Sequence, residues 1–167
     1  MKIVLAFSGG LDTTFCALYL KEQYNAEIVT ATVDTGGFSA EELSEIEARA
    51  KALGAAAHYT LDGKAQVFER FALPLIQGNI LRGRVYPLSV AAERVLQAEL
   101  VATLALELGA DAVAHGSTGA GNDQVRFDAV FNVAAPGLKC LAPIRELGWA
   151  RQKETDWLAE RGVAVAA

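Results

Sequence analysis

The chain has 167 residues, 52% of them hydrophobic, so it can bury one sizeable core in a single domain. Its net charge of −5 argues against a surface for non-specific nucleic-acid binding, which needs a basic footprint. No apolar run approaches the roughly 20 residues of a membrane span, and Met1-Lys2 leads directly into the first predicted strand, without room for a signal peptide. We therefore expect a cytoplasmic chain that binds neither nucleic acid nor membranes.

Short apolar runs alternate with longer helical patterns, which indicates parallel strands joined by helical crossovers. Strands are predicted at residues 2–7, 27–33, 56–60, 111–115 and 138–142, and helices at about 12–24, 39–53, 63–79, 89–109, 122–133 and 150–162. The fold class is therefore α/β: a three-layer sandwich with an open parallel sheet of about five strands and helices on both faces. The apolar ending, residues 162–167, is expected either to form a last strand or to continue into something else.

A Ser-Gly-Gly-X-Asp turn, residues 8–12, joins the first predicted strand to the first predicted helix. Glycine lacks a Cβ, so consecutive backbone N–H groups there can approach an anion closely. The first turn of the helix adds free amides and the positive end of the helix dipole. A Gly-Gly pair can also be an ordinary tight turn. The segment lacks the Gly-Lys-Ser/Thr ending of a P-loop and the third glycine of the dinucleotide fingerprint, and it resembles the pyrophosphate loop of the ATP pyrophosphatase family.

A second cluster of polar and glycine residues, residues 114–127, follows the fourth predicted strand. In an open parallel sheet it opens at the same carboxyl edge as the first turn, where ligands bind. Arg126 can bind an α-carboxylate with two hydrogen bonds while Asp123 accepts from an α-ammonium, which suits an amino-acid ligand. The plainer interpretation is a polar loop capped by Asn122 at the start of the next helix.

Other polar residues have ordinary structural explanations. His115 ends a buried strand and is expected to be structural rather than a general base. Asp34 could lie near a ribose or simply hold the turn that follows its strand. Cys16 and Cys140 are isolated and lack metal spacing, so buried free thiols are expected and no metal site is predicted.

Three motifs, in their order and spacing, resemble the N-terminal nucleotide-binding domain of the argininosuccinate synthase family. They are Ser-Gly-Gly-Leu-Asp-Thr, His-Gly-X-Thr-Gly-X-Gly-Asn-Asp-Gln-Val-Arg-Phe and Ala-Pro-Ile-Arg. The resemblance covers nearly the whole chain and implies an adenine nucleotide alpha hydrolase-like fold. It implies an AMP-forming C–N ligase of arginine biosynthesis: citrulline is adenylated by ATP, which carries Mg²⁺, and aspartate then displaces AMP to give argininosuccinate. No nucleophilic side chain is required, and no catalytic residue is assigned.

Site residues follow from the resemblance by matching motifs. ATP would be bound by Ala6, Phe7, Ser8, Gly9, Gly10, Leu11, Asp12, Thr13, Thr14, Val33 and Gly116. Aspartate would be bound by Thr118, Asn122 and Asp123, and citrulline by Tyr86, Asn122 and Arg126.

The chain departs from the family pattern at three places. Thr14 stands where the family usually has serine, and Ala120 where a lysine is common. Ala91 stands where a hydroxyl is expected to meet citrulline, and Ser89 is a possible substitute.

We expect residues 1–167 to form one ATP-binding domain without the family's C-terminal synthetase and oligomerisation domain. The site would then be completed in a homo-oligomer, by that missing domain or by a partner chain. Two other functions remain open: a stand-alone ATP-binding module without activity of its own, and a different adenylating ligase of the same superfamily. The run Asn122-Asp123-Gln124-Val125-Arg126 argues against the second.

Overall fold

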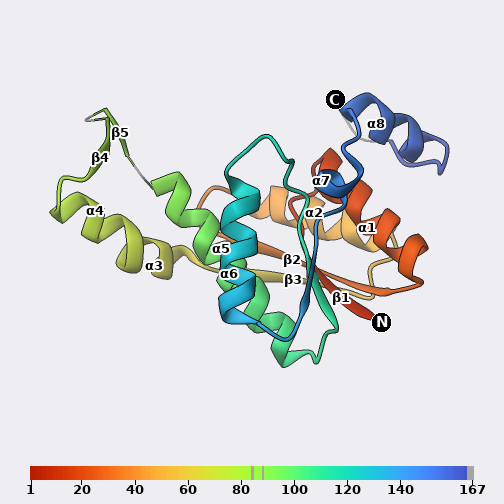
Figure 1. Cartoon of the computed structure of the whole chain (residues 1–167), viewed down its shortest axis with the longest axis horizontal. Helices are drawn as coiled ribbons and strands as arrows, with labels where there is room; N and C mark the ends of the chain where they lie inside the picture. Colours follow the sequence, from red (N-terminus) through yellow and green to blue (C-terminus); the bar gives the residue numbers. More distant parts are fainter. Residues whose placement is uncertain (84, 88, 165–167) are drawn as a thin grey trace.

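The computed structural model describes residues 1–83, 85–87 and 89–164. Its centre is a parallel five-stranded sheet in the order β3-β2-β1-β6-β7 (Figure 1). The strands are β1 (Lys2–Ala6), β2 (Glu27–Asp34), β3 (Ala57–Asp62), β6 (Ala112–Ala114) and β7 (Lys139–Leu141). The predicted parallel α/β sheet is thus confirmed, with each strand within about two residues of its expected bounds.

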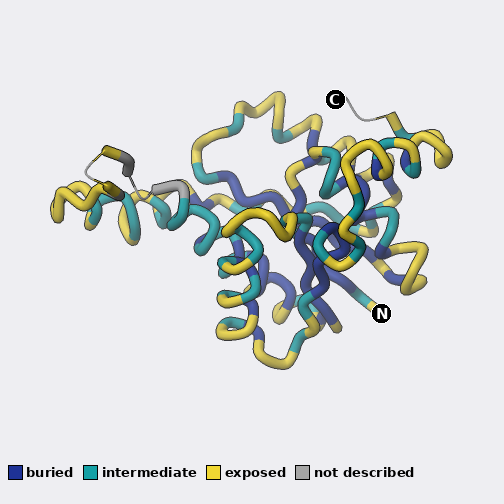
Figure 2. The backbone as a smooth tube through the Cα atoms, turned by 45° about the horizontal axis from the view of Figure 1, so that its top comes forward, coloured by how far each residue is buried: buried dark blue, intermediate teal, exposed yellow. Residues whose placement is uncertain are grey.

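Helices cover both faces of the sheet because successive residues of a strand point to opposite sides. On one face, Ile3 and Leu5 pack with α1 (Leu11–Tyr24), α2 (Ala40–Ala52), α7 (Pro143–Leu147) and α8 (Arg151–Ala159). On the other, Val4 packs with α5 (Ser89–Glu107) and α6 (Asp123–Ala134). Buried residues concentrate in the sheet and the helix faces against it (Figure 2).

An arm extends from the sheet between β3 and α5 (Figure 1). It comprises α3 (Lys64–Val67), the π-helical turn η1 (Phe68–Ala72), α4 (Leu73–Gln77) and an antiparallel hairpin of β4 (Leu81–Arg82) and β5 (Tyr86–Pro87). The predicted helix over 63–79 is present but widens at η1, just before Pro74 at the start of α4. Proline lacks the N–H of a regular helical turn, which explains the local change in hydrogen bonding.

The structure adds two elements that the sequence did not predict, the β4–β5 hairpin and the short helix α7. Residues 163–164 form no strand, and 165–167 lie outside the described residues, so a final strand is not observed in the described part of the tail. Within the described ranges, no helix has the length and apolar character needed to cross a membrane.

Candidate nucleotide and amino-acid site

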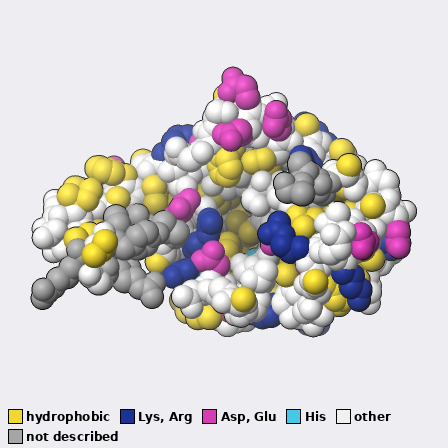
Figure 3. Space-filling view, turned by 90° about the horizontal axis from the view of Figure 1, so that it is seen from above, with side chains coloured by type: hydrophobic (Ala, Val, Ile, Leu, Met, Phe, Trp, Pro, Cys, Tyr) yellow, Lys and Arg dark blue, Asp and Glu magenta, His cyan; other side chains and the backbone are white. Residues whose placement is uncertain are grey.

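A cavity of about 490 Å³ opens at the carboxyl edge of the sheet, where the first turn and the second cluster meet. Figure 3 looks onto this face, which is hollowed near its middle, with hydrophobic side chains inside and charged side chains around. Most of the predicted ligand-binding residues line it: Ala6, Phe7, Ser8, Gly10, Leu11, Asp12, Thr13, Val33, Gly116, Thr118 and Asp123. The two motifs therefore form one site, as expected from strands that end at the same edge.

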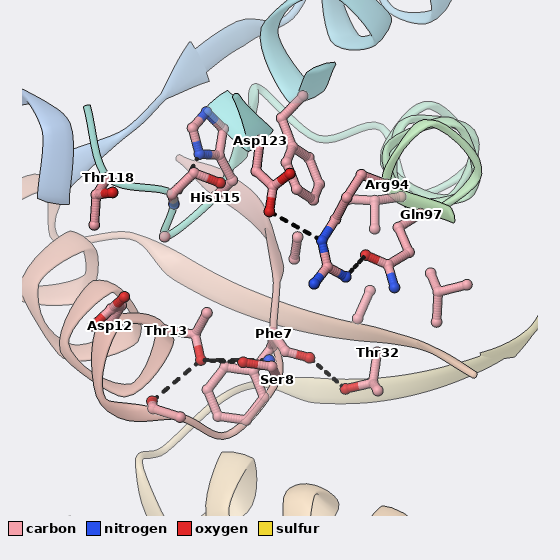
Figure 4. Close-up of a pocket in the computed structure, with 18 of the residues that line it drawn as sticks. Phe7, Ser8, Asp12, Thr13, Thr32, Arg94, Gln97, His115, Thr118 and Asp123 are labelled. Atoms are coloured by element: carbon pink, nitrogen blue, oxygen red, sulfur yellow. Dashed lines mark hydrogen bonds and ion pairs between the residues drawn. The ribbon is translucent and has the colours of Figure 1, made fainter. Parts of the chain in front are cut away.

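The first loop is organised around Thr13 (Figure 4). Its Oγ1 donates to the carbonyl oxygen of Gly10 at 3.3 Å, lies 3.3 Å from the Ser8 hydroxyl, and accepts from the Ser8 N–H at 3.4 Å. Gly10 occupies the N-cap position of α1, and among the described residues no side chain caps this helix. The amides of its first turn are therefore available to an anion in the cavity.

Gly9 supports this loop from behind and does not line the cavity. Its φ of +73° lies in the left-handed region, and a Cβ there would come within 3.2 Å of Ile46 Cγ1. Its carbonyl oxygen accepts a hydrogen bond of 2.6 Å from Arg49 on α2. Glycine is required at this position by the backbone conformation and by the closeness of α2.

Thr14 also lies away from the cavity. It is buried on the inner side of α1, and within the described part of the chain its hydroxyl has no hydrogen-bond partner. The cavity lining therefore does not include Thr14, which was predicted among the ATP-binding residues, because the helix turns Thr14 about 100° from Thr13.

The second loop passes close to the first at Gly116. A Cβ at Gly116 would lie 3.1 Å from Thr13 Cγ2 and 3.3 Å from the Thr13 backbone nitrogen. The glycine therefore allows the two loops to meet beside the N-terminus of α1.

Asp34 holds a turn and does not line the cavity. Its carboxylate accepts from Lys64 Nζ at 2.6 Å and from the Gly36 N–H at 2.8 Å. The hydrogen bond from Lys64, followed by that from Gly36, holds the pKa of Asp34 below its usual range. Of the two interpretations considered for Asp34, the structure favours turn formation over ribose contact. Neighbouring Thr32 does line the cavity, and its hydroxyl donates to the carbonyl oxygen of Phe7 at 2.6 Å.

Asp123 lies between two arginines, Arg94 and Arg126, on the side of the cavity formed by α5 and α6. Figure 4 shows its ion pair with Arg94. Its Oδ2 accepts from Arg94 Nε at 3.2 Å and its Oδ1 from Arg126 Nη1 at 2.5 Å. Arg94 also donates to Gln97 Oε1 at 2.7 Å. Arg94 and Gln97 both line the cavity, whereas Arg126 does not. In this arrangement the guanidinium facing the cavity is that of Arg94, where the sequence predicted Arg126.

The other residues predicted to bind the amino-acid substrates differ in their position relative to the cavity. Thr118 is exposed and lines the cavity. Asn122 is exposed but does not line it, and its side chain makes no capping bond to α6, so the expected cap is wrong. The side chains of Tyr86 and Ser89 lie outside the described residues.

Further cavity residues were not predicted. They are Ala31, Thr32, Phe38, Arg94, Gln97, Val101, His115, Ser117, Gly121, Phe127 and Arg151. Arg94 follows Ser89 and Ala91 closely in the sequence, and this nearness to the predicted citrulline-binding segment was the one available signal for it. Arg151 comes from α8, far along the chain from the first loop, and adds a positive charge to the lining.

Known proteins resemble this chain along nearly its whole length. Residues 2–164 match a family described as "Arginosuccinate synthase N-terminal HUP domain". The argininosuccinate synthase of Sulfolobus acidocaldarius is 44% identical over 165 residues, which cover 99% of this chain and 42% of that protein. For that of Saccharolobus solfataricus the identity is 46%, over the same shares of the two chains. The chain therefore spans about two fifths of the length of these relatives.

Among solved structures, the fold resembles the crystal structure of a predicted subunit of tRNA methyltransferase from Methanocaldococcus jannaschii. The TM-score is 0.65 at 18% sequence identity, covering 96% of this chain and 76% of that one, which supports the fold alone. The family match and the relatives at 44–46% identity show, beyond the fold, the family of this chain. The chain belongs to the arginosuccinate synthase family, in which it corresponds to the N-terminal HUP domain.

Proposed function

We propose that this chain is the ATP-binding part of an argininosuccinate synthase, which adenylates the ureido oxygen of citrulline and then joins aspartate to it with release of AMP. The observation that supports this most is the meeting of two groups in one cavity: the uncapped first turn of α1 behind Ser8 and Gly10, and Thr118 with Asp123 from the second loop. The first group suits a polyphosphate, and the second an amino acid.

The proposed chemistry needs charge stabilisation and positioning more than a reactive side chain. Negative charge grows on the α-phosphate and on the departing pyrophosphate, and preorganised amides at the start of α1 would stabilise it. Arg151 faces the same cavity and would add positive charge. Mg²⁺ would arrive with the triphosphate and neutralise part of its charge, and the Asp12 carboxylate, which lines the cavity at the start of α1, would offer it an oxygen ligand.

The Arg94–Asp123–Arg126 group suits recognition of amino-acid substrates. An incoming α-carboxylate would compete with Asp123 for Arg94, while the released Asp123 oxygen would accept from an α-ammonium. The carboxylate–guanidinium pair would thus be exchanged for two pairs with the ligand. The rest of the citrulline site would come from a further domain or a partner chain, because the chain covers 42% of its relatives.

One assay separates this proposal from its alternatives. The purified chain is incubated with ATP, Mg²⁺ and citrulline, with and without aspartate, and both pyrophosphate and AMP are followed. Citrulline-dependent pyrophosphate release supports the synthase half-reaction. ATP binding without turnover favours the stand-alone module, and pyrophosphate release that depends on a different acceptor favours another adenylating ligase. Failure to bind ATP overturns all three.

A further inference from the structure

A partly buried hydrogen-bond network joins the second loop to β7 and α7 through Asp128 on α6. His115 Nε2 lies 3.2 Å from Asp128 Oδ1, and Cys140 Sγ donates to the same oxygen at 3.3 Å. Arg145 Nη1 donates to the other carboxylate oxygen. Asp128 thus accepts hydrogen bonds from side chains on β7, on α7 and just after β6. It does not line the cavity.

The network reaches the cavity loop at two points. At its start, the Ser117 N–H donates to His115 Nδ1 at 3.1 Å. Further along, Arg145 Nη1 donates to Gln124 Oε1 at 3.3 Å, and Gln124 Nε2 donates to the Gly119 carbonyl oxygen at 2.7 Å. Residues 115–119, which include Gly116, Ser117 and Thr118 of the lining, are therefore tied at both ends to groups that meet at Asp128.

The hydrogen bonds fix the tautomer of His115. Because Nδ1 accepts from the Ser117 N–H, the ring proton must be on Nε2, and this Nε2–H donates a hydrogen bond to Asp128. The ring is 1% exposed and stacks on Phe127 with centroids 5.2 Å apart. Burial lowers the pKa of His115, against the raising effect of Asp128, so the neutral form is favoured.

The charges support the same arrangement. Burial alone would raise the pKa of Asp128, but hydrogen bonds from Arg145, His115 and Cys140 outweigh it and hold the carboxyl ionised. Burial and the bond to Asp128 raise the pKa of Cys140 to about 12, so its thiol keeps its proton.

These three side chains also have a spacing compatible with a metal ion, since ligand atoms of His115, Asp128 and Cys140 lie within 4.8 Å of one another. The protonation of His115 and Cys140 argues against metal binding by this group. A metal would need Nε2 and the thiol deprotonated, whereas Nε2 and Sγ both serve as donors here. The Arg145 guanidinium on Asp128 would also repel a cation.

We propose that Asp128 is a positioning residue for this site: through His115 and Arg145 it holds the loop of residues 115–119 in the shape that lines the cavity. The ligands of that loop rest on the proposed function, whereas the positioning itself is a property of the chain. Loss of Asp128 should leave the first loop intact and release the second.

The test uses histidine imidazole NMR on the whole chain, which has two histidines, with His58→Gln to assign the signals. The wild-type chain should show His115 as the neutral Nε2–H tautomer throughout the range from about pH 6 to about pH 8, where an ordinary histidine titrates. In Asp128→Ala, His115 should lose this single tautomer, and the amide signals of Ser117 and Gly119 should shift. Asp156→Ala, which alters an exposed carboxylate on α8, should change none of them.

Asp128→Asn distinguishes the two connections of Asp128 to the loop, one through His115 and one through Arg145. It also provides a test if the alanine variant fails to fold. Its amide oxygen can still accept from His115, so the tautomer should persist, while its uncharged side chain should weaken the Arg145 branch and shift Gly119. Unchanged His115, Ser117 and Gly119 signals in Asp128→Ala, or an unchanged Gly119 signal in Asp128→Asn, would overturn the inference. So would binding of Zn²⁺ that shifts His115 in the wild type but not in Cys140→Ser.

A parallel titration with ATP keeps the two proposals apart. ATP affinity should fall by about tenfold in Asp128→Ala, as expected when one charged hydrogen-bond network is lost, because Gly116 contacts the first loop at Thr13. If the wild-type chain binds no ATP, the proposed function fails, while the imidazole spectrum still decides the positioning role. If ATP affinity is unchanged although the His115 signals move, Asp128 shapes the loop without positioning it for the ligand, and the inference fails in that form.

Discussion

Arg49, on α2, donates a hydrogen bond of 2.6 Å to the carbonyl oxygen of Gly9 in the Ser8–Thr13 loop. A loop that binds an anion through its N–H groups must turn its carbonyl oxygens away from the anion. The left-handed backbone conformation of Gly9 turns its carbonyl oxygen toward α2, and the hydrogen bond from Arg49 pairs this oxygen there. The helix dipole and the glycine pair therefore act together with a side chain that lies 40 residues further along the chain.

Arg49→Met tests this relationship, because methionine keeps the aliphatic stem but cannot donate the hydrogen bond. We expect ATP affinity, measured by isothermal titration calorimetry, to fall by about tenfold, the size expected for one charged hydrogen bond. Lys51→Met is the matched control on the same helix, since Lys51 pairs with Glu47 at the surface. Equal losses in the two variants would show that general charge, and not the bond to Gly9, is responsible.

Gly116→Ala should disturb the contact between the two loops. The new Cβ would lie 3.3 Å from the backbone nitrogen of Thr13, which cannot move aside as a flexible side chain would. We expect the free energy of unfolding by urea to fall by about 1–3 kcal/mol, as for other overpacked sites, together with a loss of ATP affinity. Gly137→Ala, where a Cβ would meet no atom within 4 Å, is the control. Wild-type stability and affinity in the Gly116→Ala chain would refute the close approach.

Glu154→Gln should change how stability depends on pH. Glu154 is 1% exposed on α8, and among the described residues its Oε2 has no hydrogen-bond partner. Burial, with a smaller effect of Asp12, raises its pKa from 4.5 to about 7. The folded state therefore prefers the protonated form, and the unfolding free energy of the wild type should decrease as pH rises from about 4.5 to about 7.

The glutamine variant stays uncharged, so it should lack this part of the pH dependence. Urea unfolding of both chains across that range should show the variant gaining stability relative to the wild type by on the order of 2–3 kcal/mol. Parallel curves for the two chains would mean that folding does not raise the pKa of Glu154.

Both thiols should react slowly with a disulfide reagent in the native chain. Cys16 is fully buried, and burial followed by the charge of Glu154 raises its pKa. Cys140 is half-buried, and its thiol donates a hydrogen bond to Asp128. We expect labelling to accelerate strongly for both in denaturant. Fast labelling of Cys140 in the native state would contradict its hydrogen bond to Asp128.

Local patterns explain which parts could be predicted. The strand, Ser8–Asp12 turn and helix are contiguous, and the second loop carries its motif within residues 114–127, so both halves of the site could be recognised. Their meeting followed from the rule that parallel strands end at one edge of the sheet. The sequence motif groups Thr14 with Thr13 because they are neighbours in the chain, while the helix directs them differently and leaves Thr14 buried outside the cavity lining.

Tertiary contacts explain what could not be predicted. Arg49 and Arg151 reach the site from α2 and α8, and neither stands in a local pattern that marks it. The pairing of Asp123 with Arg94 was likewise hidden, because Arg94 lies on another helix. Two-residue strands such as β4 and β5 carry too little periodicity to be recognised.

The central claim is that the Ser8–Thr13 loop binds the phosphates of ATP, and calorimetric titration of MgATP into wild-type and Gly10→Val chains tests it most directly. Gly10 lines the cavity, and a Cβ there would meet only Ser8 Oγ, at 3.6 Å, so added bulk should spare the fold. We predict that the wild type binds MgATP and that Gly10→Val, with an unchanged unfolding transition, does not. Equal binding by the two folded chains, or no binding by the wild type, would contradict the account.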